Sequence, residues 1–179
     1  MAEYLQHKLL GEDITDISFD ALRGVCALYA LRMYEAVLKN EPDFEGALTL
    51  FDGYGWSFFN REMYRVFGEE YASRLLSRFT GDNFYDPDSH WSRVLRIKER
   101  YYTDLRPRLS FLPSYSSILP VIRSVSFPTG LADLDFSKGE AVDALVWSKE
   151  VSPRYGILRL LADVGLLEYA AERLTSNLK

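Results

Sequence analysis

A basic island at residues 93–123 is the part of the chain whose residue types point most directly to chemistry. It has seven basic and two acidic residues, a net charge of +5, in a chain whose formal net charge is −5. Arginine beside an aromatic ring can grip a phosphate and stack on a base, and the same residue types anchor protein interfaces. A third interpretation is a solvated helix face whose aliphatic stems cover apolar surface. Six of the seven basic residues are interleaved with aromatic residues: Arg93, Arg96, Lys98, Arg100, Arg106 and Arg108 alternate with Trp91, Tyr101, Tyr102, Phe111 and Tyr115, and the seventh is Arg123.

The charge of the surrounding chain favours a protein partner over nucleic acid. Residues 1–60 have ten acidic and four basic side chains, and such a surface repels a long polyanion. It also complements the island, so one molecule's acidic end can meet another's basic island in a head-to-tail contact. The alternatives are an acidic face that mimics nucleic acid and an acidic surface that is simply solvated. The predicted partner-binding residues are Arg93, Arg96, Lys98, Arg100, Tyr101, Arg106 and Arg108.

An acidic loop at residues 82–90 is the best metal candidate, because Asp82, Asp86, Asp88 and His90 lie close together in the sequence. Carboxylates and imidazole are the usual ligands of hard and borderline metal ions. The spacing does not fit a calcium loop, because the sixth position counted from Asp86 is Trp91, where a glycine is needed. We interpret the aspartates as turn and cap residues and expect no metal and no other cofactor. A metal-dependent enzyme that uses this loop is kept as an alternative.

The other catalytic templates are incomplete. Gly53-Tyr54-Gly55 lacks the third glycine of a dinucleotide-binding loop, since the third position is Phe58, and no P-loop lysine follows. A Ser-His-Asp mechanism would need His7 or His90 as its base, and no G-x-S-x-G motif marks a nucleophile. Cys26 is the one cysteine, which excludes an intrachain disulfide and a cysteine-based zinc site. We predict that its thiol belongs to the core and that the chain has no catalytic residue.

Residues 157–179 have the spacing of the first part of a helix-turn-helix unit. Such a unit needs a second helix that reads the DNA, and the chain ends soon after the last helical pattern. The segment also lacks a basic excess. A packed helical hairpin is the interpretation we favour.

The elements that position all these residues are helices. Residues 18–40 contain no proline and place apolar side chains at helical spacing, with Ser18 suited to the N-cap. The opposite side mixes charged and apolar residues, which is typical of a helix buried on two sides. We therefore predict that this helix is the central spine. Its apolar face is Leu22, Val25, Cys26, Tyr29, Met33, Ala36 and Val37.

We predict a mostly α-helical single domain over residues 1–179, a bundle of about eight helices. Residues 1–17 form a short helix or docked arm, and Pro107, Pro113, Pro120 and Pro128 make residues 105–130 irregular. Short helical turns, a small hairpin or an edge strand all fit that stretch. Further helices are expected at residues 44–51, 57–67, 69–79 and 89–104, after a capping box at Ser137 and Glu140, and after an N-cap at Ser152 followed by Pro153.

These features predict a noncatalytic protein–protein interaction module: an adaptor, an inhibitor or immunity-type protein, or an assembly subunit. A partner protein or self-association would use the basic aromatic surface. A nucleic-acid-binding component of a larger complex is the first alternative, and the metal-dependent enzyme is the second. No signal peptide and no apolar run of about 20 residues is visible, so we expect no membrane partner and a cytoplasmic location.

Overall fold

The spine predicted at residues 18–40 is helix α2 (Phe19–Lys39) of the computed structural model, which describes residues 1–14, 16–53, 56–79, 87–152 and 154–178. The Ser18 hydroxyl oxygen accepts a hydrogen bond from the Ala21 amide at 3.1 Å, so the predicted N-cap is correct. Asn40 ends the helix. The completely or nearly completely buried side chains of α2 are Leu22, Val25, Leu28, Tyr29, Met33 and Val37.

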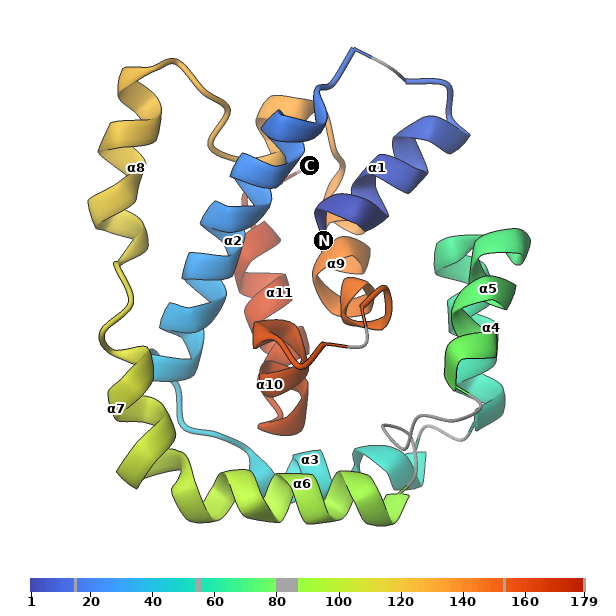
Figure 1. Cartoon of the computed structure of the whole chain (residues 1–179), viewed down its shortest axis with the longest axis vertical. Helices are drawn as coiled ribbons and strands as arrows, with labels where there is room; N and C mark the ends of the chain where they lie inside the picture. The colour runs from blue at the N-terminus through green and yellow to red at the C-terminus, as the bar shows by residue number, and fades with distance from the viewer. Residues whose placement is uncertain (15, 54–55, 80–86, 153, 179) are drawn as a thin grey trace.

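Other helices surround α2, as Figure 1 shows. Helix α1 packs on one side of it and α8 on the other, while α10 and α11 contact it from behind. This arrangement explains why α2 needs apolar residues on more than one face. The bounds of these helices are α1 (Ala2–Gly11), α8 (Tyr115–Ser124), α10 (Ile157–Asp163) and α11 (Leu167–Thr175).

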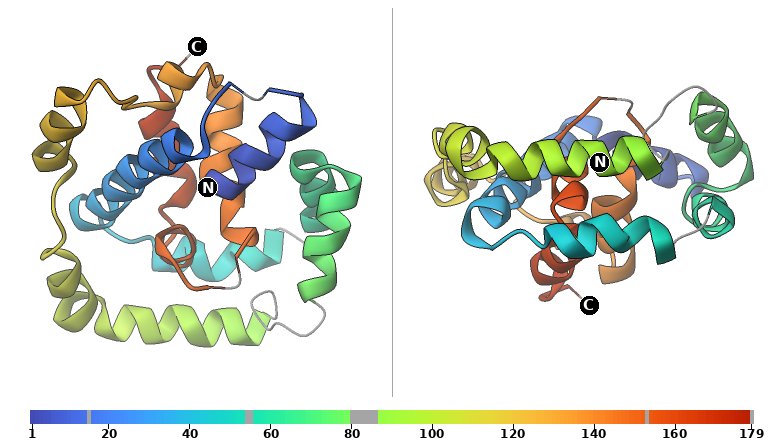
Figure 2. Two further views of the ribbon diagram at one scale, coloured as in Figure 1. Left: turned by 45° about the horizontal axis from the view of Figure 1, so that its top comes forward. Right: turned by 90° about the horizontal axis from the view of Figure 1, so that it is seen from below.

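Most of the remaining helices form an outer frame that is best seen in Figure 2. Helices α3 and α6 lie side by side, and α4 and α5 form a hairpin. The α4–α5 turn is Gly68, whose φ of 71° suits glycine. Helix α9 (Lys138–Trp147) lies inside the frame and packs on α11. The frame consists of α3 (Phe44–Gly53), α4 (Trp56–Phe67), α5 (Glu69–Phe79), α6 (Pro87–Arg100) and α7 (Arg106–Leu109).

The mostly α-helical, single-domain fold predicted from the sequence is confirmed. The structure is 77% helical, and its described residues include no strand. One hydrophobic cluster joins α1, α2, α4, α5, α9, α10 and α11. In the segment predicted to be a short helix or docked arm, α1 buries Tyr4, Leu5 and Leu9 and leaves Leu10 60% exposed.

The proline-containing stretch resolves into short helical pieces. Helix α6 continues into one π-helical turn (Tyr101–Leu105), which leads directly into α7. Helix α8 contains Pro120 in its interior, where the ring removes one backbone hydrogen bond. The hairpin or edge strand that we considered for this stretch does not form. All of residues 105–130 are described, and none of them belongs to a β-strand.

Two cap predictions in the C-terminal third had different outcomes. The capping box is correct: the Ser137 hydroxyl accepts from the Glu140 amide, and the Glu140 carboxylate accepts from the Ser137 amide at 2.7 Å. The N-cap predicted at Ser152 is wrong, because its hydroxyl accepts from Arg154 only two residues later and α10 starts at Ile157. Pro153, the second half of that prediction, lies outside the described residues.

Candidate functional site

Helix α6 presents the N-terminal part of the basic island. Residues three and four apart share a helix face, so Arg93, Arg96 and Arg100 follow one flank of α6. The structure gives the first of these a different environment from the other two. Arg93 is half-buried, whereas Arg96 and Arg100 are exposed.

The Arg93 guanidinium is bound inside the protein. Its Nε atom lies 2.7 Å from Oδ2 of Asp163, and its Nη2 atom lies 3.2 Å from Oδ1 of the same carboxylate. Asp163 belongs to α10 and is buried. The prediction that Arg93 binds an external partner therefore needs correction: its charge is matched by the chain's own carboxylate.

Tyr101 and Arg106 also have internal partners, at the C-terminal end of α2. The Tyr101 ring is completely buried, and its hydroxyl donates to the Val37 carbonyl at 2.6 Å. The Arg106 guanidinium donates to the Leu38 carbonyl at 2.7 Å. The last carbonyls of a helix have no partner within the helix, and a cation there is favoured by the helix dipole. Both residues thus fix the end of the spine, which corrects their assignment to a partner-binding surface.

Lys98 and Arg108 lie on the surface and form weak ion pairs. The Lys98 ammonium lies 3.0 Å from Glu45 of α3, and Arg108 pairs with Asp104 one helical turn earlier. All four side chains are at least 46% exposed. Exposed pairs of this kind contribute about 0–1 kcal/mol, so either cation can exchange its partner for another carboxylate.

Arg96 and Arg100 are the exposed arginines of α6 that make no ion pair or hydrogen bond with any residue in the described ranges. They lie one helical turn apart on the same flank. We call these two residues the arginine stripe. Of the seven residues predicted to bind a partner, the stripe is the part whose charge no described residue matches.

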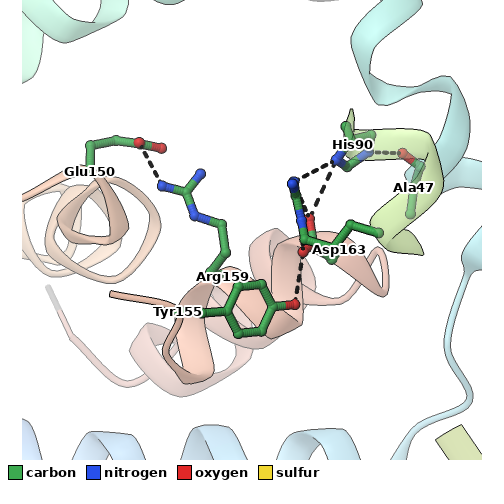
Figure 3. Close-up of polar contacts among 7 residues, drawn as sticks. Ala47, His90, Glu150, Tyr155, Arg159 and Asp163 are labelled. Carbon is green, nitrogen blue, oxygen red and sulfur yellow. Dashed lines mark hydrogen bonds and ion pairs between the residues drawn. The ribbon is translucent and has the colours of Figure 1, made fainter. Parts of the chain in front are cut away.

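A buried polar cluster, shown in Figure 3, lies behind α6 and was not expected from the sequence. Its centre is Asp163, which accepts hydrogen bonds from Arg93 and, at 2.8 Å, from the Tyr155 hydroxyl. Burial by itself raises the pKa of Asp163, but the bonds from His90, Arg93 and Tyr155 outweigh burial and hold that pKa below its ordinary value. Asp163 is therefore a carboxylate at neutral pH. Burial and the neighbouring Asp163 charge raise the pKa of Tyr155, which stays protonated.

Both ring nitrogens of His90 have partners inside the protein. His90 Nδ1 lies 3.1 Å from Arg93 Nη2 and 3.4 Å from Asp163 Oδ1. His90 Nε2 lies 2.9 Å from the Ala47 carbonyl oxygen. Both ring nitrogens are engaged inside the protein, and neither is available to a metal or a substrate.

The surroundings of His90 do not favour the metal site considered at residues 82–90. Asp82 and Asp86 lie outside the described residues, and Asp88 is exposed while His90 is buried. Among the described residues no group of three or more metal-ligating side chains comes together. The proposed glycine-rich loop falls partly on residues 54 and 55, which also lie outside the described ranges.

A second buried ionic group is formed by Glu150, Arg159 and Lys149. The Glu150 carboxylate lies 3.0 Å from the Arg159 guanidinium and 3.1 Å from the Lys149 ammonium. Burial lowers the pKa of Lys149, while the Glu150 charge opposes that change. Figure 3 shows the Glu150–Arg159 pair beside the Asp163 cluster, and Arg159 lies one turn before Asp163 on α10, so one helix anchors both networks.

Cys26 is half-buried and packs against the core, as the sequence predicted. Burial raises the pKa of its thiol to about 11, so the nucleophilic thiolate is scarce at neutral pH. A hollow of about 340 Å³ opens between the start of α1 and the α9–α10 connection, and its lining includes Arg23, Ser148 and Ser152. None of the buried acids or bases described above lines it.

Helix α11 has the wrong charge for reading DNA. Its exposed positions include Glu168 and Glu172, and Glu172 pairs with Lys138 of α9 at 3.2 Å. Helices α10 and α11 pack against each other and against α2. The pair is therefore the packed helical hairpin that the sequence favoured.

No protein-family model, no curated protein and no solved structure matches the chain. None of the described helices is long and apolar enough to cross a membrane. Function is therefore inferred from the side chains and their surroundings.

Proposed function

We propose that the chain is a noncatalytic protein–protein interaction module that docks an acidic protein surface through the arginine stripe. The observation that supports this proposal is that Arg96 and Arg100 are exposed without a carboxylate partner in the described chain. Every other cation of α6 has one. Two adjacent guanidinium groups suit carboxylate pairs on a partner, because arginine binds carboxylates in a bidentate manner.

Exposed aromatic side chains lie on the flank opposite the stripe, on α6 and the π-helical turn that follows it. Trp91 and Tyr102 are about half exposed, and Tyr102 donates a 2.5 Å hydrogen bond to Glu41. Residues 91, 95, 98 and 102 share the other edge of the helix by spacing. Tryptophan, tyrosine and arginine are the residue types most enriched among residues that dominate binding energy. The proposal includes a cytoplasmic location, supported by a single cysteine that forms no disulfide within the chain.

Nucleic acid is the alternative ligand, because the two arginines of the stripe could also hold a phosphate backbone. The alternative is weaker on charge, because a net charge of −5 opposes a long polyanion outside the immediate stripe. The metal-dependent enzyme has less support still, since the contacts of His90 inside the protein remove one of its four ligands.

The test is the double variant Arg96→Glu/Arg100→Glu. In pull-downs from the native host, the wild type should capture at least one specific protein that the variant does not capture. The matched control is Arg74→Glu/Arg78→Glu on α5, which makes the same charge change at the same spacing on another exposed surface. Circular dichroism should show that both variants keep the helical content of the wild type.

A salt titration separates the protein partner from nucleic acid. Binding of single-stranded or duplex probes that weakens steeply with salt, and that the stripe variant abolishes, would assign the stripe to nucleic acid. A folded stripe variant that retains every partner would remove the proposal's main support.

A further inference from the structure

Residues 102–130 lie on the outside of the protein, and only partly buried side chains such as Leu105 and Leu109 pack against its core. None of the residues in this range is completely buried. The segment contains the end of the π-helical turn, α7 and α8, and Figure 1 shows it along the left side of the molecule. Helix α8 contacts α2 with its inner face, where the Tyr115 amide donates to Glu35 at 2.7 Å. Its outer face is uncovered, and we call residues 102–130 the outer segment.

The outer segment exposes apolar side chains that would normally be buried. Phe111 is 88% exposed, Val125 is 69% exposed and Val121 is 62% exposed. Clusters of exposed large apolar residues usually mark interaction surfaces. The segment has a net positive charge: residues 102–130 contain three arginines and one acidic residue, Asp104, which pairs with Arg108. Arg108 and Arg123 are exposed beside the apolar side chains.

A surface with matching properties lies at the α1–α2 connection. Residues 9–22 contain four acidic residues and no basic one, and the exposed acids include Glu12, Asp13 and Asp16. Two apolar side chains stand among them, Leu10 at 60% and Ile14 at 36% exposure. Asp13 and Asp16 form no ion pair within the described chain. We call Leu10, Glu12, Asp13, Ile14 and Asp16 the acidic corner.

We propose that the outer segment of one molecule binds the acidic corner of a second copy of this chain. The pairing joins apolar side chains on both surfaces and surrounds them with opposite charges, which is the arrangement that steers protein association. Helix α8 and helix α1 lie on opposite sides of α2 in Figures 1 and 2. A molecule therefore cannot cover its own outer segment with its own corner, and the contact is between molecules.

The proposed contact is head-to-tail, because two different surfaces meet. An open assembly has an unused outer segment at one end and an unused corner at the other, so association either closes into a ring or extends as a filament. An interface of standard size uses about 20–30 residues on each side. The outer segment is long enough to supply one side. This contact is independent of the arginine stripe, which belongs to α6.

Sedimentation velocity of the full chain over a range of concentrations tests the proposal. The segment variant is Phe111→Ser/Val121→Ser, and the corner variant is Asp13→Asn/Asp16→Lys. Asparagine is chosen because residue 13 has a φ of 57°, which asparagine tolerates. The wild type should self-associate as concentration rises, and each variant alone should require at least tenfold higher concentration. The conservative variant Phe111→Leu/Val121→Ile should associate like the wild type.

Mixing the two variants gives the decisive result. The mixture contains one intact corner and one intact segment, so it should form a 1:1 dimer and nothing larger. A wild type that stays monomeric at all concentrations overturns the proposal, and so does a mixture that stays monomeric. A corner variant that still associates would show that the outer segment pairs with itself or with another site. The stripe variant Arg96→Glu/Arg100→Glu should self-associate normally, so the two proposals fail or succeed separately.

Discussion

Replacing Asp163 by asparagine would test whether the buried polar cluster holds α6 against α10. The change keeps the size of the side chain and removes its charge, so it opens no cavity. Removing one member of a buried ion pair costs about 3–5 kcal/mol. Arg93 is 20% exposed and can regain some water, so we expect the lower end, about 3 kcal/mol. For a chain of this size that corresponds to a melting temperature about 6–12 °C lower.

Urea denaturation followed by circular dichroism measures this change, and Glu45→Gln provides the matched control. Glu45 also pairs with a cation of α6, at 3.0 Å, but the pair is exposed. The same carboxylate-to-amide change should cost less than about 1 kcal/mol there. An Asp163→Asn variant within about 0.5 kcal/mol of the wild type at neutral pH, a change typical of surface substitutions, would refute the reasoning about Arg93.

The pH dependence of the same variant has a definite sign. The pKa of Asp163 is lower in the folded chain than its ordinary value. Its contribution to stability is therefore complete above about pH 4 and is lost as the pH falls through the folded value. The difference in unfolding free energy between wild type and Asp163→Asn should shrink below about pH 4. A difference that stays constant down to pH 2 would contradict the assignment.

Two further perturbations test other parts of the structure. Gly165 ends α10 with a φ of 70°, and an added Cβ would lie 2.5 Å from the Asp43 carbonyl oxygen, so Gly165→Ala should cost about 3 kcal/mol or more in thermal or urea denaturation. Gly139→Ala, where nothing lies within 4 Å, should instead stabilise α9 by about 0.5–1 kcal/mol. The pKa of about 11 for Cys26 predicts slow alkylation by iodoacetamide at pH 8 and a rate that rises up to about pH 11. Mass spectrometry measures the alkylation rates of the folded chain and of the urea-unfolded chain. Equal rates for the two at pH 8 would contradict the burial of this thiol.

The sequence was sufficient for the elements whose signals are local. Helical periodicity located α2, and the hydroxyl of Ser18 and the carboxylate of Glu140 made the predicted caps. These signals depend on residues no more than four positions apart, so neighbours in the sequence determine them. Ser152 shows the limit of such reasoning, because a serine can accept from an amide two residues later instead of starting a helix.

The candidate site was predicted only in part, because charge alone does not show which cations have internal partners. Arg93 and Asp163 are 70 residues apart in the chain, and no local pattern links them. From the sequence we predicted that Tyr101 lies on the partner-binding surface, but the π-helical turn places its ring in the core. One signal was available: Arg93 and His90 are three residues apart on α6 and share its inner flank.

Helix α8 has a proline in its interior and no buried side chain. Regions with few interior contacts open at a lower free energy than the rest of a protein. The amide hydrogens of α8 should thus exchange with solvent sooner than those of α2. The surface that we assign to a second molecule is, for the same reason, the one best able to adjust its conformation when that molecule arrives.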